Sequence, residues 1–162
     1  MKKVVKIVLV LLIITSCACR QEVVTESDFT DDHFFINHEI KPYEGICVTL
    51  FNKTETVKAK MFFKEGVMEG LTTTFYNNGS KQQEGNYKRG KFHGEWKKWY
   101  ACGNLAYDIT YANGMLNGKY VLYHRNGAKK EEGKYMLNKR AGLWKTYNEL
   151  GELTAQVEYG PN

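Results

Sequence analysis

The sequence contains few residues that would interrupt β-strands. Proline occurs only twice in 162 residues, at Pro42 and Pro161, so none falls in the long stretch between them. Because a proline removes a backbone donor from a strand ladder, its absence there favours an uninterrupted sheet. Aromatic residues make up 14% of the chain, which is unlike a disordered protein, and we expect the chain to fold.

The sequence also lacks the motifs of common active sites. It has no Cys-x-x-Cys pair, no serine in an elbow setting and no phosphate-loop lysine pattern among its glycines. His33 and His38 would need a third ligand to hold a metal, and a solvated acidic segment is the simpler interpretation. His93 and His124 stand at repeat positions that other copies fill with unrelated residues, so we interpret them as surface or filler. We therefore predict no enzyme, and neither a metal, a cofactor nor a small-molecule substrate.

The net charge of +5 is unevenly distributed. Residues 1–16 carry +3, residues 17–40 carry −5 and residues 41–162 carry +7. A modestly basic body favours association with anionic surfaces or acidic proteins in general. The basic residues form no dense patch, so we predict no binding to nucleic acid.

Residues 1–16 are typical of an export signal. Lysines precede an apolar run that is too short to form a permanent membrane span. The run ends in Ile14-Thr15-Ser16-Cys17, which resembles a bacterial lipobox and implies that Cys17 is lipidated. Cys19 fits that pattern less well, and an ordinary cleaved signal with an incidental Cys17 is the alternative. The lipobox implies a membrane-anchored lipoprotein of the bacterial cell envelope.

Residues 17–40 are acidic and show no periodic apolar pattern, so we interpret them as a tether between the anchor and a domain at residues 41–162. Residues 34–36 could instead form a short strand that covers the first edge of that domain.

The domain repeats with a period of 24 residues, which is the mark of a repeat architecture. Glycines recur as Gly70, Gly94, Gly118 and Gly142, and as Gly79, Gly103, Gly127 and Gly151. A third set is Gly66, Gly90, Gly114 and Asn138, and asparagine is a common replacement for glycine where φ must be positive. Aromatic columns keep the same register, as Phe75, Trp99, Tyr123 and Tyr147 and as Tyr87, Tyr111, Tyr135 and Tyr159.

Segments between the turn signals are about six to eight residues long, which fits strands and leaves no room for helices. Asn78-Gly79, Asn113-Gly114 and Asn126-Gly127 are favoured in tight hairpin turns because both positions tolerate positive φ. We predict an all-β fold, an elongated antiparallel β-meander of about five two-stranded repeats with about nine or ten strands. Cys47 and Cys102 fall in different repeats, too far apart for a disulfide, so we expect two unpaired thiols.

The segment Gly85-x-Tyr87-x-x-Gly90-x-x-x-Gly94-x-Trp96 resembles the MORN repeat. The 24-residue spacing and the Tyr-x-x-Asn-Gly turns are closer to the bacterial variant in YwqK-type antitoxin proteins. The resemblance implies an open β-meander that binds a partner protein, which in the YwqK-type case is a toxin. An envelope scaffold, or a module that binds a membrane surface, is the alternative.

Aromatic side chains are expected on both faces of the middle repeats. Trp96 and Trp144 follow the repeat glycine by two residues, whereas Trp99 and Tyr147 follow it by five, so strand alternation places them on opposite faces. Exposed aromatic surface commonly marks an interaction site, although both sets could simply stabilise a thin sheet. The predicted contact residues are Trp96, Lys97, Lys98, Trp99, Tyr120, Tyr123 and Trp144.

Overall fold

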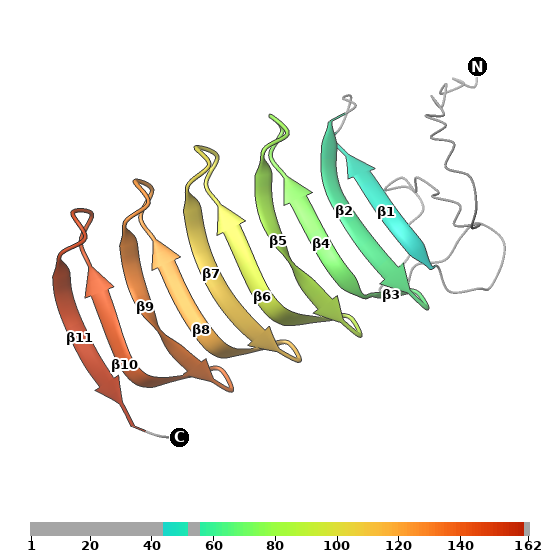
Figure 1. Cartoon of the computed structure of the whole chain (residues 1–162). Helices are drawn as coiled ribbons and strands as arrows, with labels where there is room; N and C mark the ends of the chain where they lie inside the picture. Colours follow the sequence, from blue (N-terminus) through green and yellow to red (C-terminus); the bar gives the residue numbers. More distant parts are fainter. Residues whose placement is uncertain (1–43, 52–55, 161–162) are drawn as a thin grey trace, which may run out of the picture.

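The computed structural model describes residues 44–51 and 56–160. They form one open antiparallel sheet in which strands that follow each other in sequence lie side by side (Figure 1). The predicted signal peptide at residues 1–16, the predicted tether at residues 17–40 and the predicted lipidation site Cys17 lie outside the described residues. The strands are β1 (Gly45–Leu50), β2 (Val57–Lys64), β3 (Val67–Met68), β4 (Gly70–Phe75), β5 (Lys81–Lys88), β6 (Lys91–Trp99), β7 (Leu105–Ala112), β8 (Met115–Tyr123), β9 (Lys129–Met136), β10 (Lys139–Tyr147) and β11 (Leu153–Tyr159).

This architecture confirms the predicted all-β meander. The part of the chain that the structure describes has 11 strands, against an expectation of nine or ten. The additional strand arises because β3 and β4 together correspond to the single strand β6 one repeat later. The break falls at Glu69, next to Gly70, whose φ of 74° turns the chain out of the extended conformation.

Two kinds of turn occupy the two long edges of the sheet. The lower edge in Figure 1 carries two-residue turns such as Asn113-Gly114, where φ is 52° and 85°. Leu137 and Asn138 take the same shape with φ of 50° and 66°, which confirms that Asn138 replaces a glycine for its backbone conformation. The upper edge carries longer loops that contain Gly79, Gly103, Gly127 and Gly151.

The prediction that Asn78-Gly79 and Asn126-Gly127 form the same tight turn as Asn113-Gly114 is wrong. Only the glycine of each of these pairs has positive φ. The asparagine instead accepts a hydrogen bond through its side chain, since Asn78 Oδ1 lies 3.0 Å from the backbone N of Ser80. The asparagine is favoured here because its short side chain closes a local turn with the backbone.

A kink in β6 folds the tip of the β5–β6 hairpin back onto the sheet. Its register with β5 moves from Asn86↔His93 directly to Gly85↔Trp96, so two residues of β6 lie outside the pairing. One of them is Gly94, with φ of 71°. The strands accordingly curve toward their lower hairpins in Figure 1.

The register of the strands defines two faces. On the first, which we call the tryptophan face, one row crosses the sheet through Thr72, Gly85, Trp96, Ile109, Tyr120 and Gly133. Trp144 continues it, because its ring lies over Gly133 and its strand partner is Val157. On the opposite face, which we call the lysine face, a row crosses through Lys60, Thr73, Glu84, Lys97, Asp108, Val121, Glu132, Lys145 and Gln156.

Two aromatic clusters on the tryptophan face, inside the bend, form a large part of the core. Trp96 is 3% exposed, and its ring meets Tyr87, Phe92 and Tyr111 at centroid distances of 5.2, 4.6 and 6.4 Å. These contacts are edge-to-face, the arrangement that the quadrupoles of aromatic rings favour. A second cluster lies two repeats later in the sequence and contains Tyr120, Tyr135, Trp144 and Tyr159.

Gly85 is required by this core and not by a turn. It is buried within β5, and a Cβ atom there would lie 2.1 Å from Cδ2 of Trp96. The indole therefore needs the bare backbone of Gly85 beneath it. Gly133 plays the same part under Trp144, where the distance would be 2.3 Å.

Hydrogen bonds along both edges connect successive repeats. At the upper edge the hydroxyl of Tyr100 donates to the carbonyl O of Tyr123 at 2.9 Å. His124 occupies the equivalent position one repeat later, and its Nε2 lies 2.9 Å from the carbonyl O of Tyr147. The residue that we interpret as surface or filler, His124, thus makes the same connection as Tyr100, because an imidazole and a phenol each reach the equivalent carbonyl of the next repeat. At the lower edge the backbone N of Gly114 donates to the carbonyl O of Phe92 at 2.8 Å.

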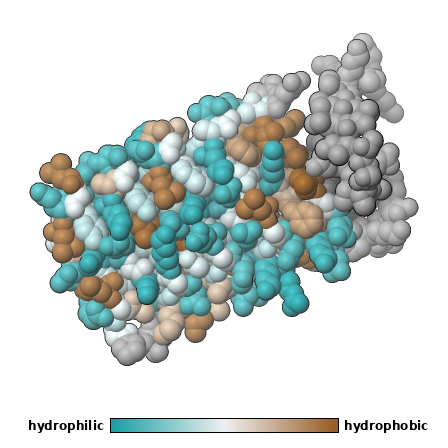
Figure 2. Space-filling model, viewed as in Figure 1, coloured by the Kyte–Doolittle hydropathy of each residue, from teal (hydrophilic) through white to brown (hydrophobic). Residues whose placement is uncertain are grey.

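No disulfide joins Cys47 and Cys102, as predicted, and of these two residues only Cys102 is exposed. Across the described residues there is no helix long and apolar enough to pass through a membrane. The surface view in Figure 2 shows hydrophilic side chains interspersed with hydrophobic ones along the sheet. The last strand, β11, is largely exposed, including Leu153 and Val157.

Candidate functional site

The seven residues predicted as a contact surface separate onto the two faces of the sheet. Trp96, Lys98, Tyr120 and Trp144 lie on the tryptophan face, whereas Lys97, Trp99 and Tyr123 lie on the lysine face. This separation agrees with the expectation that Trp96 and Trp99 point to opposite sides. A single partner surface can therefore use one subset or the other.

The tryptophans of the first subset are structural side chains. Trp144 is 2% exposed and, like Trp96, donates its indole N–H to a backbone carbonyl, here that of Lys134 at 3.2 Å. Lys98 is paired with Tyr107, a half-buried residue whose pKa is raised to about 12 by burial and, to a smaller extent, by Tyr111. These indole rings offer little surface to a partner.

The second subset belongs to a half-buried aromatic stripe on the lysine face, formed by Phe75, Trp99, Tyr123 and Tyr147. Lysines of the neighbouring strands lie against it. Lys81 Nζ is 5.3 Å from the ring centroid of Trp99, and Lys60 Nζ is 6.0 Å from that of Phe75. Such a surface offers both apolar area and positive charge to a partner.

The centre of the lysine face contains a buried carboxylate. Asp108 is 5% exposed, and its Oδ2 accepts a hydrogen bond from Lys119. Its other oxygen, Oδ1, is buried without a hydrogen-bond partner. Lys97, which stands opposite Asp108, has a raised pKa because its ammonium bonds to Glu95 at 3.1 Å and is also attracted by Asp108.

A second carboxylate is fully engaged by its neighbours. Glu132 accepts hydrogen bonds from Lys129 Nζ at 2.7 Å and from the Tyr147 hydroxyl at 2.6 Å. Both bonds stabilise its charged form and hold its pKa below the usual range, with Lys129 as the larger cause. The same contact raises the pKa of Tyr147.

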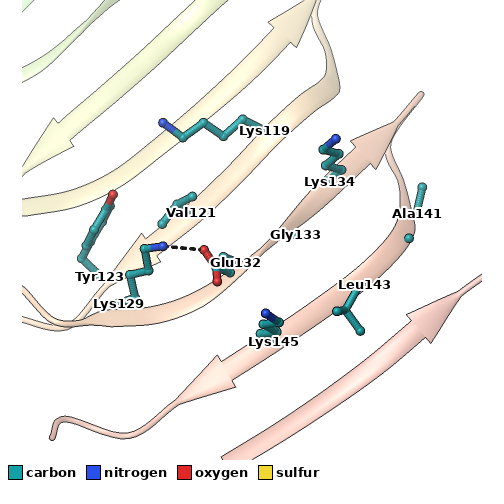
Figure 3. A pocket seen from close by; sticks show the side chains of 11 residues that line it. Lys119, Val121, Tyr123, Lys129, Glu132, Gly133, Lys134, Ala141, Leu143 and Lys145 are labelled. Atoms are coloured by element: carbon teal, nitrogen blue, oxygen red, sulfur yellow. Dashed lines mark hydrogen bonds and ion pairs between the residues drawn. The ribbon is translucent and has the colours of Figure 1, made fainter. Parts of the chain in front are cut away.

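A groove with a volume of about 600 Å³ crosses β8, β9 and β10 on the lysine face (Figure 3). Its lining is Lys119, Val121, Tyr123, Lys129, Glu132, Gly133, Lys134, Ala141, Gly142, Leu143 and Lys145. Of these, sequence reasoning selected only Tyr123. The lysines are not adjacent in sequence and occupy different positions in the 24-residue repeat, so they meet only through strand register and no spacing signal selects them.

Within the part of the chain that the structure describes, no three His, Cys, Asp or Glu side chains are placed to hold a metal ion. The lysine face instead presents cationic, aromatic and aliphatic side chains on a rigid sheet. That combination is suited to binding a macromolecular surface.

Residues 68–89 and 92–113 match the MORN repeat variant. The two matches cover β4 and β5 and then most of β6 and β7, so the match confirms the MORN part of the resemblance in the middle of the sheet. MORN repeats are generally modules for interaction with proteins or membranes, and this all-β fold is a non-enzymatic repeat type. No curated protein matches the chain significantly.

Proposed function

We propose that this protein is a lipid-anchored, non-enzymatic repeat protein that binds a partner protein through the lysine face. The observation that carries the proposal is the half-buried aromatic stripe at Trp99 and Tyr123, with Lys81 over the first ring. Aromatic side chains are enriched in protein interfaces. The core needs Trp96 and Trp144, whereas the stripe leaves part of each ring available.

The anchor is proposed from the sequence. Cys17 follows a lipobox-like Ile14-Thr15-Ser16, and a diacylated cysteine would hold the sheet at a membrane of the bacterial envelope. Replacement of Cys17 by serine should move the protein from the membrane fraction to the soluble fraction, provided that export still occurs. Retention of the variant in the membrane fraction after a carbonate wash would contradict the anchor.

The finer proposal is a role as an antitoxin or immunity protein, with a toxin as the partner. It is supported by the 24-residue spacing and by the Tyr-x-x-Asn-Gly pattern, which runs from Tyr123 to Asn126-Gly127. An envelope scaffold or membrane-surface module is the second candidate, and the basic balance of residues 41–162 favours it. A toxin partner would arrest growth when produced without this protein, whereas a scaffold partner would not.

The contact surface is tested by crosslinking in the native host followed by mass spectrometry of the co-purified proteins. Trp99→Ala with Tyr123→Ala should abolish recovery of the partner while circular dichroism remains that of the folded sheet. The matched control is Leu153→Ala with Val157→Ala, which removes two exposed apolar side chains from β11. Undiminished recovery with the first variant, or equal loss with the control, would exclude the stripe as the contact surface.

A further inference from the structure

Two lysines face each other across β8 and β9, although like charges in directly opposed positions destabilise a sheet. These are Lys119 and Lys134, and both are exposed. The equivalent pairs in the other repeats are Leu71↔Asn86, Glu95↔Thr110 and Leu143↔Glu158. No other repeat places two cations at this position, so the regular fold does not demand them.

The nearby carboxylates do not neutralise the groove completely. Asp108 engages Lys119, and Glu132 is occupied by Lys129 and the Tyr147 hydroxyl. Among the described residues, neither Lys134 nor Lys145 has a carboxylate within ion-pair distance, although Lys145 stands opposite Glu132. Two cations are therefore available to a ligand.

Apolar side chains lie between these cations. Val121 is buried in the floor, Leu143 is 46% exposed at the side, and Ala141 stands opposite Lys134. Figure 3 shows Lys134 and Lys145 on adjacent strands, with Ala141 and Leu143 next to them. A ligand that fills the groove meets positive charge and aliphatic surface in alternation.

We propose that this groove binds an extended acidic segment of the partner protein, in which carboxylate side chains alternate with apolar ones. Lys134 and Lys145 lie on neighbouring strands and two residues apart in register, so their backbones are roughly 8 Å apart. Carboxylates at positions i and i+2 of an extended chain lie about 7 Å apart on one side. The apolar residue between them then points to the other side of the extended segment.

The inference rests on the proposed function, because it names the chemistry of the partner for the same face. A flat anionic membrane is the competing ligand. It fits the site less well, because the cations line a hollow that also contains aliphatic side chains and a buried valine.

The test uses the full chain purified in a nonionic detergent and two fluorescein-labelled octapeptides. One alternates glutamate and valine, and the other alternates glutamine and valine. Fluorescence anisotropy should rise saturably with the glutamate peptide only, and the affinity should fall when salt is raised to about 0.5 M, which shortens the screening length below the spacing of the charges. Equal binding of the two peptides, or no binding of either, would overturn the proposal.

The site is tested by Lys134→Glu with Lys145→Glu, which should weaken binding of the glutamate peptide by about tenfold or more through loss of both attractions. The matched control is Lys88→Glu with Lys91→Glu, which reverses the same number of charges at an opposed lysine pair outside the groove. The control should remain within about twofold of the parent protein. Equal weakening in both variants would show a general charge effect and overturn the assignment to the groove.

Two further measurements separate the remaining alternatives. Micelles doped with phosphatidylserine should leave the peptide bound, whereas displacement by them and not by phosphatidylcholine would assign the groove to a membrane. If the crosslinked partner is lost with Trp99→Ala and Tyr123→Ala but kept with the groove variant, the proposed function stands and this inference fails.

Discussion

Replacing Gly85 by alanine should destabilise the protein far more than an ordinary glycine substitution in a strand. The new Cβ would lie 2.1, 2.3 and 2.5 Å from Cδ2, Cε2 and Cγ of Trp96. All three distances are below any real carbon–carbon contact, and the ring cannot tilt freely because its Nε1–H bonds to the carbonyl O of Asn86 at 3.0 Å. Either the strands separate or the indole leaves the cluster.

These two responses give a lower and an upper limit for the loss in the free energy of unfolding. Overpacking that a core absorbs by small shifts costs about 1–3 kcal/mol. Complete displacement of the indole approaches the loss from Trp→Ala in a core, about 3–5 kcal/mol. We expect a decrease of roughly 3 kcal/mol in the free energy of unfolding, which is a large part of the roughly 5–15 kcal/mol of a typical domain.

The assay is urea unfolding followed by far-ultraviolet circular dichroism, carried out as a double-mutant cycle with Trp96→Ala. If the contact with the ring is the cause, adding Gly85→Ala to Trp96→Ala should change stability by less than about 1 kcal/mol. Gly103→Ala is the control for backbone strain, because its φ is 92° with no atom within 4 Å, and it should cost about 1–2 kcal/mol. An undiminished effect of Gly85→Ala in the Trp96→Ala background would refute the reasoning.

Three further outcomes follow from the contacts described. Tyr100→Phe removes the hydroxyl that bonds to the carbonyl of Tyr123, so the free energy of unfolding should fall by about 1 kcal/mol in urea titrations, and no change would show that water replaces the bond. Glu132 has a lowered pKa, so its contribution to the free energy of unfolding is fully present above its unfolded pKa and is lost as pH falls through its folded pKa. The difference in stability between the parent protein and Glu132→Gln should therefore shrink below about pH 4.5. A difference that does not depend on pH would contradict this expectation. Cys102 is exposed and has a lowered pKa, chiefly through a backbone hydrogen bond at Asn104, so peptide mapping after brief maleimide treatment should find it labelled while buried Cys47 reacts only on unfolding; early labelling of Cys47 would show that the first hairpin opens.

The fold was predictable because the same spacing of turn and strand residues occurs in several repeats. The 24-residue glycine sets place the turns, and the residues between them can only be strands at that length. Even the exception at Asn138 was informative, since asparagine tolerates the positive φ that the structure shows there.

The reason for some residues could not be read from spacing alone. Gly94 recurs every 24 residues and Gly85 recurs only two repeats later as Gly133, and neither spacing shows that Gly85 lies under an indole while Gly94 kinks a strand. Both structural roles require a residue without a Cβ atom, so the sequence shows that glycine is needed but not why it is needed. The kink also moves the pairing of β6 by two residues, which only the register between strands reveals.

The candidate site was predictable only in part. Strand alternation correctly places Trp96 and Trp99 on opposite faces of the sheet. Only the burial of each side chain shows which face belongs to the core, and this burial depends on the hairpin tips that fold over one face. The groove lysines Lys119, Lys134 and Lys145 come from three different strands. Lys119 and Lys134 lie opposite each other because of the pairing register between β8 and β9, which the sequence of one strand does not determine.

The hydrogen bonds at the two long edges also constrain how such a chain can change length in evolution. Each joins one repeat to the next, as Tyr100 does to the carbonyl of Tyr123, so duplication or deletion of 24 residues recreates every bond at the new junction. Insertion of 12 residues would add one strand, reverse the direction of all later strands and place two-residue turns where the longer loops belong. Inherited length differences should therefore come in whole units, each adding two strand spacings, or about 10 Å, to the span of the sheet.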